Sequence, residues 1–242
     1  MSERRARTAR RPRRAPSQHF FRRAFAAELV RDARLGRVDL VADLGAGTGR
    51  LTGELALAAR RVVAVELDPR LAGLLRGRWP NVEVVEADVR EVPLPSEPFR
   101  VVANLPFHGT NEILCHLLDD PRVPLVRADL VVQWGVAVKR ALPWPSTVNG
   151  VVWSAWHTTR ADRRLPRNAF EPPPSVDAGV LVFERCAEPL VPPELAPGYR
   201  RFVARGFRLG PRVVGADPRR LDPHEWATRY LAAHRRTSRV RH

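Results

Sequence analysis

The chain has 242 residues, of which 44% are hydrophobic and 28% are charged. This composition excludes a wholly disordered or collagen-like chain, and the length allows folding to remove about 70% of the unfolded chain's surface from water. Lys and Arg number 41 against 26 Asp and Glu, which gives a formal net charge of +15. Such a basic excess favours a polyanionic partner.

Residues 1–16 hold a dense part of this charge. A single acid, Glu3, stands against seven arginines, which are Arg4, Arg5, Arg7, Arg10, Arg11, Arg13 and Arg14. An organelle transit peptide would also be rich in arginine and poor in acids. We favour a disordered basic arm whose arginines bind RNA phosphate groups.

Cysteine usage and hydropathy indicate the compartment. Cys115 and Cys186 are the two cysteines, they lie far apart, and no C-x-x-C spacing is present. This pattern suits a reducing compartment and provides neither a disulfide framework nor a metal site. The longest apolar stretches, such as residues 130–138, are interrupted by Gln133 and are far shorter than a membrane span. We expect a cytoplasmic protein with no metal and no membrane partner.

Residues 19–133 alternate between helical and strand patterns. The apolar residues of 19–34 have near-helical spacing, and residues 45–49 are a glycine-rich turn after a buried strand. The predicted strands span residues 38–44, 61–66, 82–85, 99–103 and 125–133, and the further helices span residues 51–59, 71–78 and 110–118. Continuous apolar strands that alternate with helices indicate a parallel sheet covered on both faces. The expected fold class is α/β, with a mostly parallel, Rossmann-like sheet.

The pattern changes after residue 148. Residues 151–156 and 178–183 are strand-like with no convincing helix between them, so we expect antiparallel pairing at the edge of the sheet. Residues 187–198 contain four prolines and are predicted to be a linker. Helices are predicted over residues 199–209 and 223–236. The chain thus divides into the arm, a main domain of residues 17–186, and residues 187–242 with a small helical domain.

Three acids follow three successive predicted strands. Asp43 precedes the turn Gly45-Ala46-Gly47-Thr48-Gly49, Glu66 ends the next strand, and Asp88 follows the third. Glycines let the backbone approach a ligand closely, and the next helix begins with unpaired N–H groups. Glu66 lies about 20 residues after the turn, where an acid receives ribose hydroxyl groups in nucleotide-binding α/β folds. Asp88 is suited to receive an adenine amino group.

Each of these acids alone has a structural explanation, because a carboxylate at a strand end commonly braces a turn or starts a loop. Three acids at the carboxyl ends of three strands instead converge on the crevice where open α/β sheets bind ligands. We therefore favour a nucleotide site. The G-x-G-x-G spacing differs from G-x-G-x-x-G, which disfavours a dinucleotide.

The sequence Asn104-Leu105-Pro106-Phe107 follows the fourth strand. A nucleobase amine is a poor nucleophile because its lone pair is delocalised into the ring. Two acceptors, the Asn104 side-chain oxygen and the Leu105 carbonyl, would hold that amine toward tetrahedral geometry and direct its lone pair at an electrophile. Pro106 stiffens the turn, and Phe107 offers a face on which an extruded base stacks. A proline turn with a core phenylalanine is the structural alternative.

Together these segments resemble the S-adenosylmethionine-dependent rRNA adenine N6-methyltransferases, specifically the Erm type that modifies 23S rRNA. The resemblance runs from Ser17 to about Arg185. It rests on SQHF at 17–20, DLGAGTGRLT at 43–52, VELD at 65–68, EAD at 86–88, NLPF at 104–107 with Thr110, VQ at 132–133 and FEPPPSVD at 170–177. It implies a class I methyltransferase fold and S-adenosyl-L-methionine as the cofactor.

The resemblance also implies roles for individual residues. The implied cofactor-binding set is Gln18, His19, Gly45, Ala46, Gly47, Gly49, Glu66, Leu67, Asp88, Val89 and Asn104. Within it, Glu66 takes the ribose hydroxyls and Asp88 with Val89 takes the adenine. The implied catalytic set is Asn104, Leu105, Pro106 and Phe107, in which Asn104 meets both the cofactor and the target amine and Phe107 stacks on the target adenine.

The function implied by the resemblance is methylation of N6 of an adenine in the peptidyl-transferase region of 23S rRNA by a monomeric enzyme, conferring resistance to macrolide-type antibiotics. One alternative is the 16S rRNA adenine dimethyltransferase of ribosome assembly, which shares the motifs. Another is an inactive RNA-binding assembly or transcription factor that keeps the fold. Phe107, the short C-terminal segment and the arginine-rich arm favour the Erm type. C-terminal arginines, including Arg235 and Arg236, would add phosphate contacts.

Overall fold

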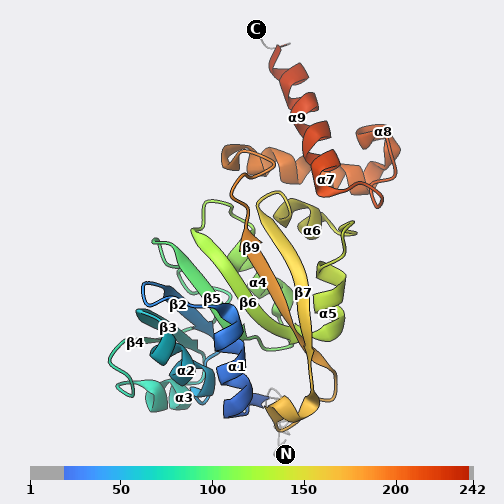
Figure 1. The fold of residues 1–242 in the computed structure, drawn as a ribbon. Helices are drawn as coiled ribbons and strands as arrows, with labels where there is room; N and C mark the ends of the chain where they lie inside the picture. The colour runs from blue at the N-terminus through green and yellow to red at the C-terminus, as the bar shows by residue number, and fades with distance from the viewer. Residues whose placement is uncertain (1–18, 240–242) are drawn as a thin grey trace, which may run out of the picture.

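The structure is a computed structural model that describes residues 19–239. Its centre is a seven-stranded sheet in the order β4-β3-β2-β5-β6-β9-β7 (Figure 1). The strands are β2 (Leu40–Leu44), β3 (Arg61–Glu66), β4 (Val82–Glu86), β5 (Phe99–Asn104), β6 (Leu125–Gln133), β7 (His157–Leu165) and β9 (Ala178–Arg185). Strands β4 to β6 run parallel and β9 is antiparallel to both of its neighbours. The predicted α/β class with a mostly parallel sheet is confirmed.

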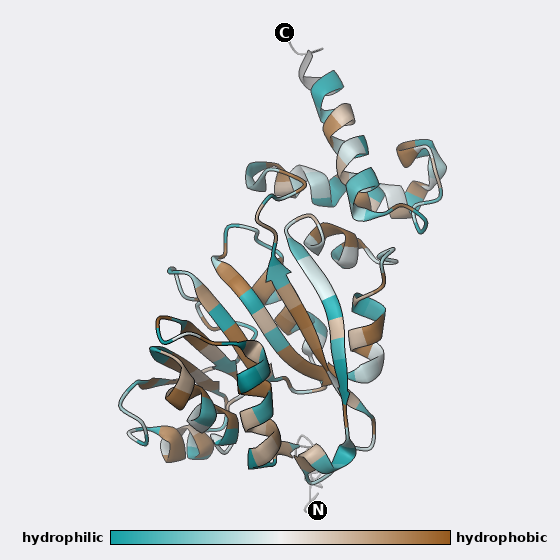
Figure 2. Cartoon of the chain, viewed as in Figure 1, coloured by the Kyte–Doolittle hydropathy of each residue, from teal (hydrophilic) through white to brown (hydrophobic). Residues whose placement is uncertain are grey.

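Helices cover both faces of this sheet. Leu29 and Leu55 pack with Val102 on the face that α1 (Arg23–Ala33) and α2 (Arg50–Ala58) cover, and α3 (Pro69–Leu75) leads into β4. Leu114 of α4 (Thr110–Leu118) packs with Val101 on the opposite face. Because neighbouring strand residues point to opposite faces, a strand covered on both sides is apolar throughout. Accordingly, β6 and β9 are largely brown in Figure 2, whereas the edge strand β7 is paler.

The region between β6 and β9 differs from the prediction. Residues 151–156 do not form a strand, because α6 (Val148–Trp153) begins after Thr147, whose side chain accepts a hydrogen bond from the Gly150 N–H. A short apolar run fits a buried helix as well as a strand. The polar strand β7 and the helix α5 (Trp134–Arg140) were not predicted. The antiparallel strand β9 is confirmed, but it lies one position inside the edge that β7 forms.

The first helix is also shorter than predicted. Phe20 and Phe21 form β1, which pairs antiparallel with β8 (Phe170–Glu171), and α1 therefore begins at Arg23. The 3-10 helix η1 (Arg167–Ala169) leads into β8, and the Arg22 N–H donates to the Ala169 carbonyl at 2.8 Å. The start of the described chain is thereby fixed to a segment about 150 residues further on.

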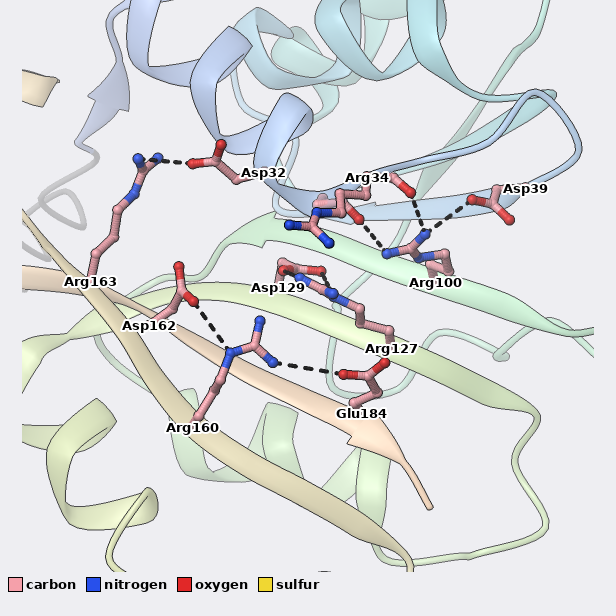
Figure 3. A network of polar contacts seen from close by, with 11 residues as sticks. Asp32, Arg34, Asp39, Arg100, Arg127, Asp129, Arg160, Asp162, Arg163 and Glu184 are labelled. Atoms are coloured by element: carbon pink, nitrogen blue, oxygen red, sulfur yellow. Dashed lines mark hydrogen bonds and ion pairs between the residues drawn. The ribbon is translucent and has the colours of Figure 1, made fainter. Parts of the chain in front are cut away.

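Polar contacts hold α1 on the sheet (Figure 3). Arg100 of β5 donates to the carbonyl oxygens of Ala33 and Arg34 at the end of α1. Arg163 of β7 lies 2.8 Å from the carboxylate of Asp32 on α1. A cation at a helix C-terminus complements the helix dipole. These contacts fix the position of α1 and hence of the segment that precedes it.

The C-terminal helices lie at the end of the sheet opposite to the end of β5 (Figure 1). Because β9 runs antiparallel, its last residues pair with the beginning of β6, where Glu184 is opposite Arg127. The short helix η2 (Pro193–Leu195) leads into α7 (Ala196–Leu209), α8 (Pro211–Val214) and α9 (Pro223–Arg239). Among residues 19–239, no helix combines the length and apolar character needed to cross a membrane.

The predicted linker is hydrogen-bonded to the main body. The Leu190 N–H donates to the Ala155 carbonyl at 2.8 Å, and the Trp156 indole N–H donates to the Val191 carbonyl at 2.8 Å. The Trp156 ring also meets the Tyr199 ring edge-on at 5.9 Å. Helix α7 begins at Ala196, so the segment without regular structure is shorter than the predicted 187–198.

Candidate active site

One edge of the sheet brings together the residues that the sequence singled out. Strands β2, β3 and β5 end there at Leu44, Glu66 and Asn104, and Asp88 lies two residues beyond β4. The glycine turn lies directly beside the end of β5, because a Cβ added to Gly45 would be 3.9 Å from the Asn104 carbonyl oxygen. The nucleotide-type turn and the Asn104 segment therefore form one continuous site.

The glycine turn needs glycine for conformation and for space. Gly45, Gly47 and Gly49 have φ values of 82°, 57° and 78°, in the left-handed region that L side chains rarely adopt. A Cβ added to Gly47 would lie 2.8 Å from the ring of Phe20. Phe20 thus covers the turn, a contact that could not be predicted because the two residues are distant in sequence.

Glu66 closes the turn from the neighbouring strand. One carboxylate oxygen accepts the Gly47 N–H at 2.7 Å, and the other accepts the Asp68 N–H at 2.9 Å. The residue is 6% exposed, whereas the next residue, Leu67, is 62% exposed. Each carboxylate oxygen has two lone pairs, so Glu66 retains acceptor capacity for a further donor.

Asp43 lies beneath the turn and is 1% exposed. The Thr52 hydroxyl of α2 donates to its carboxyl group at 2.6 Å. Burial raises the pKa of Asp43 to about 7, the Thr52 hydrogen bond opposes this rise, and the negative charge of Glu66 adds to it. Asp43 therefore fastens β2 to the start of α2, which is a bracing position.

Asp88 has a neighbour that the sequence reasoning missed. The Arg90 guanidinium Nε lies 2.9 and 3.1 Å from the two carboxylate oxygens of Asp88, and the Arg90 backbone N–H donates at 2.9 Å. These hydrogen bonds lower the pKa of Asp88 to about 2. The signal in the sequence is an arginine two residues after the acid, a spacing that repeats at Asp120 and Arg122. Val89, between Asp88 and Arg90, is buried.

Asn104 is held by the N-terminal segment. Its side-chain N–H donates to the His19 carbonyl at 2.7 Å, which directs the amide oxygen of Asn104 to the other side of the group. His19 in turn contacts the Pro172 carbonyl through Nδ1 at 2.9 Å. The ring of Phe107 lies 5.9 Å from the His19 ring at an interplanar angle of 39°. The N-terminal segment, the Asn104 segment and the proline-rich segment after β8 therefore meet.

Two further contacts shape this corner of the site. The Thr110 hydroxyl at the start of α4 donates to the Pro106 carbonyl at 3.0 Å and so fixes the turn after Asn104. Arg50, the first residue of α2, donates to the Phe21 carbonyl at 2.8 Å and lies 3.3 Å from Glu171. Arg50 was not predicted as a site residue, yet it ties both strands of the β1–β8 pair to the helix that begins at the glycine turn.

The remaining predicted site residues lie elsewhere. Gln18 and the arginines of the basic arm lie outside the described residues. Arg235 and Arg236 are exposed on α9. Helix α9 lies far from β2 and α2 in Figure 1. His116 of α4 donates a ring N–H to the Val92 carbonyl at 2.8 Å, away from this site. Within the described residues, no group of three or more His, Cys, Asp or Glu side chains could hold a metal ion.

The strand order, the reversed strand β9 and the glycine turn beside the strand-end acids define a class I methyltransferase fold. A family model described as ribosomal RNA adenine dimethylase matches residues 11–229, and the chain belongs to this family. The crystal structure of the 23S rRNA methyltransferase ErmE superposes with a TM-score of 0.71 at 27% identity, over 88% of this chain and 98% of that chain.

Curated relatives agree with this assignment. An rRNA adenine N-6-methyltransferase of Corynebacterium diphtheriae is 37% identical over 182 residues, which cover 74% of this chain and 71% of that protein. The mycinamicin-resistance protein MyrB of Micromonospora griseorubida is 36% identical over 172 residues, which cover 71% of this chain and 54% of that protein. The chain thus spans between about half and seven tenths of the length of these relatives.

Proposed function

We propose that the protein transfers a methyl group from S-adenosyl-L-methionine to N6 of an adenine in the peptidyl-transferase region of 23S rRNA and so confers resistance to macrolide-type antibiotics. Membership of the rRNA adenine dimethylase family and the likeness to the 23S rRNA methyltransferase ErmE support this choice of substrate. The net charge of +15 suits an RNA partner.

The observation that carries the proposal is the orientation of Asn104. Its amide nitrogen is occupied by the His19 carbonyl, and this leaves the amide oxygen as an acceptor at the edge of the sheet. An acceptor there can receive an N–H of the adenine amine and draw its lone pair out of conjugation with the ring. Leu105, held through its N–H by the Val131 carbonyl at 3.1 Å, offers its own carbonyl as the second acceptor.

The residues around the turn fit the cofactor. Glu66 retains lone pairs for ribose hydroxyls, Leu67 offers exposed apolar surface to a flat ring, and Asp88 is an ionised acceptor for an exocyclic amine. Gly47 lies beneath Phe20 with no room for a side chain. When bound, S-adenosylmethionine supplies an electrophilic methyl group on a sulfonium centre.

Proton transfer makes a small demand on the protein. An adenine amine that has accepted a methyl group is cationic and acidic, so it can lose its proton to water without a strong general base. The two groups placed to receive the amine, the Asn104 amide oxygen and the Leu105 carbonyl, act as hydrogen-bond acceptors and need not take up its proton. Phe107 is half-buried and has one ring neighbour in His19, and we propose that it stacks on the extruded target adenine.

Each part of the chain has its own role in the proposed function. Residues 17–186 form the catalytic domain, with Gln18 and His19 at its start. The arginines of residues 1–16 bind phosphate groups, and so do Arg235 and Arg236 in the C-terminal part, residues 187–242. The enzyme acts as a monomer in the cytoplasm. Phosphate contacts of this kind orient RNA without reading its sequence.

The test is transfer of a labelled methyl group from S-adenosylmethionine to separated 23S and 16S rRNA, with the modified position mapped by primer-extension stops. We expect one stop in the peptidyl-transferase region of 23S rRNA and none in 16S rRNA. Mass spectrometry of the modified nucleoside then counts the methyl groups. Stops near the 3′ end of 16S rRNA would assign the chain to ribosome assembly, and no incorporation would favour an inactive RNA-binding factor.

Asn104→Ala is the matched variant for this test. It should abolish transfer, because an alanine cannot accept the amine N–H, while S-adenosylhomocysteine binding measured by calorimetry stays within about fivefold of the wild type. Methyl transfer at the wild-type rate by this variant would refute the role of Asn104.

A further inference from the structure

One face of α7 carries arginines that no acid neutralises. Arg201, Arg205 and Arg208 are all exposed, and their spacing of four and three residues places them on one face of the helix. The opposite face is buried through Tyr199 and Val203. Among the residues that the structure describes, no carboxylate lies within 4.0 Å of any of the three guanidinium groups. We call these three residues the α7 arginine stripe.

The stripe differs from most other arginines of the described chain. Arg60, Arg76 and Arg122, for example, are exposed but each lies 2.8 Å from a carboxylate. Around the stripe the balance is strongly basic, since residues 196–236 contain ten arginines and three acids. A free guanidinium group can release counterions from a polyanion, whereas a paired one must first give up its acid.

The stripe is presented by a helix that is fixed to the catalytic body. Arg200, next to the stripe, lies 2.6 Å from Asp119 at the end of α4 and donates to the Asn149 side-chain oxygen at 2.9 Å. Tyr199 packs against Trp156, and Val203 belongs to the same hydrophobic cluster as the sheet. Because α7 is already anchored, binding through its outer face requires little ordering of the backbone.

The position of the stripe separates it from the catalytic edge. Asn104 pairs with Val131 of β6 in the sheet, and Val131 pairs with Val180 of β9. Five further residues of β9 lead to Arg185, and at about 3.3 Å per residue this is about 17 Å. Helix α7 lies beyond that end of the sheet (Figure 1). RNA that only fills the site around Asn104 therefore does not reach the stripe.

We propose that the α7 arginine stripe binds the phosphate backbone of an RNA duplex segment other than the one that delivers the target adenine. The proposal rests on the proposed function and extends it, because the RNA would then be held at both ends of the sheet. A duplex is favoured over a single strand because the aromatic neighbours Phe202 and Phe207 face inward and pack on Trp226, leaving no stacking platform beside the arginines. Contacts to phosphates alone add affinity without sequence preference.

The test compares two RNAs and three protein variants. The first RNA is a stem-loop that carries the target adenine on an A-form stem of about four base pairs, which is shorter than the separation of about 17 Å along β9. The second is a 23S fragment with the neighbouring helices. The variant Arg201→Gln/Arg205→Gln/Arg208→Gln removes the stripe and keeps good helix formers. Arg60→Gln/Arg76→Gln/Arg122→Gln removes the same charge from paired arginines, and a triple Arg→Lys variant of the stripe restores charge.

The dissociation constants are measured against salt concentration with the full chain, and circular dichroism checks folding. We expect the stripe variant to bind the long fragment at least about fortyfold more weakly at 50 mM salt, with a log–log salt slope reduced by about three, one for each lost phosphate contact. Binding of the stem-loop should change less than twofold. The paired-arginine variant should keep the wild-type slope, and the lysine variant should regain most of the loss.

Equal losses for both RNAs, or an unchanged slope with the long fragment, would overturn the proposal, and so would an equal loss in the paired-arginine variant. Failure of the proposed function gives a different result, because the wild-type protein would then methylate neither RNA. If the stripe substitutions do not change RNA binding and the wild-type protein still methylates its RNA, the RNA contact proposed for the stripe is refuted and the proposed function stands.

Discussion

Arg90 donates to both carboxylate oxygens of Asp88, the acid that we propose to receive the adenine amino group. The Arg90 backbone N–H also donates to Asp88 at 2.9 Å, so the carboxylate stays oriented without the side chain. The guanidinium therefore occupies acceptor capacity that the cofactor would use. We therefore expect the pair to tune cofactor affinity without being needed to build the site.

Arg90→Met should consequently strengthen the binding of S-adenosylhomocysteine. Freeing the Asp88 acceptors for the adenine amine should lower the dissociation constant of S-adenosylhomocysteine by about two- to tenfold, since one net hydrogen bond contributes about 0.5–1.5 kcal/mol. Titration calorimetry at pH 7 measures this. The control is Arg122→Met, which removes the same i, i+2 pairing from Asp120 at the opposite end of the sheet and should leave affinity unchanged. Weaker binding in Arg90→Met alone would show that the guanidinium positions Asp88.

Arg50 offers a second test of the proposed cofactor site. Its guanidinium holds the Phe21 carbonyl at 2.8 Å, next to the Phe20 ring that covers Gly47. Arg50→Met should release this segment and weaken S-adenosylhomocysteine binding by about three- to tenfold. Glu171→Gln should have a smaller effect, because its contacts to Arg50 are 3.3 and 3.4 Å long and exposed. An equal loss in both variants would assign the effect to the ion pair.

The contacts of Arg50 and Arg90 were not predicted from the sequence, whereas other parts of the fold were. The parallel strands and the glycine turn could be predicted because buried strands are apolar throughout and the turn residues are adjacent. The place of Asn104 at the end of its strand could be predicted from the same apolar pattern. The contact of Phe20 with Gly47 and the bond from Asn104 to the His19 carbonyl join distant segments, and no local pattern encodes them. Strand β7 escaped prediction because its outer side chains form ion pairs instead of an apolar run.

Asp43 gives the fold a pH dependence that runs opposite to ordinary acid denaturation. Its folded pKa of about 7 lies above the unfolded value of 3.8, so the unfolded chain releases its proton first as the pH rises. Stability is full below pH 3.8 and is lost as the pH rises to 7. We expect the wild type to lose about 2.5 kcal/mol between pH 5 and 8 relative to Asp43→Asn in urea unfolding. Thr52→Val should extend the loss of stability to higher pH, because the Thr52 hydroxyl group opposes the rise in the pKa of Asp43. If the stability of the wild type and of Asp43→Asn changed with pH in parallel, the raised pKa of Asp43 would be contradicted.

His157 makes the stability of the fold depend on pH in the opposite direction, so that stability falls as the pH decreases. It is 2% exposed at the start of β7, and burial, with the nearby positive charge of Arg185, lowers its pKa from 6.5 to about 4. The folded state keeps the ring neutral while the unfolded chain takes up a proton, so stability falls as the pH drops from 6.5 toward 4. Relative to His157→Gln, the wild type should lose about 2.5 kcal/mol of unfolding free energy between pH 7.5 and 4.5. His224→Gln, at an exposed position on α9, is the control and should follow the wild-type curve. If His157→Gln has the same pH profile as the wild type, the acid sensitivity of this fold arises elsewhere.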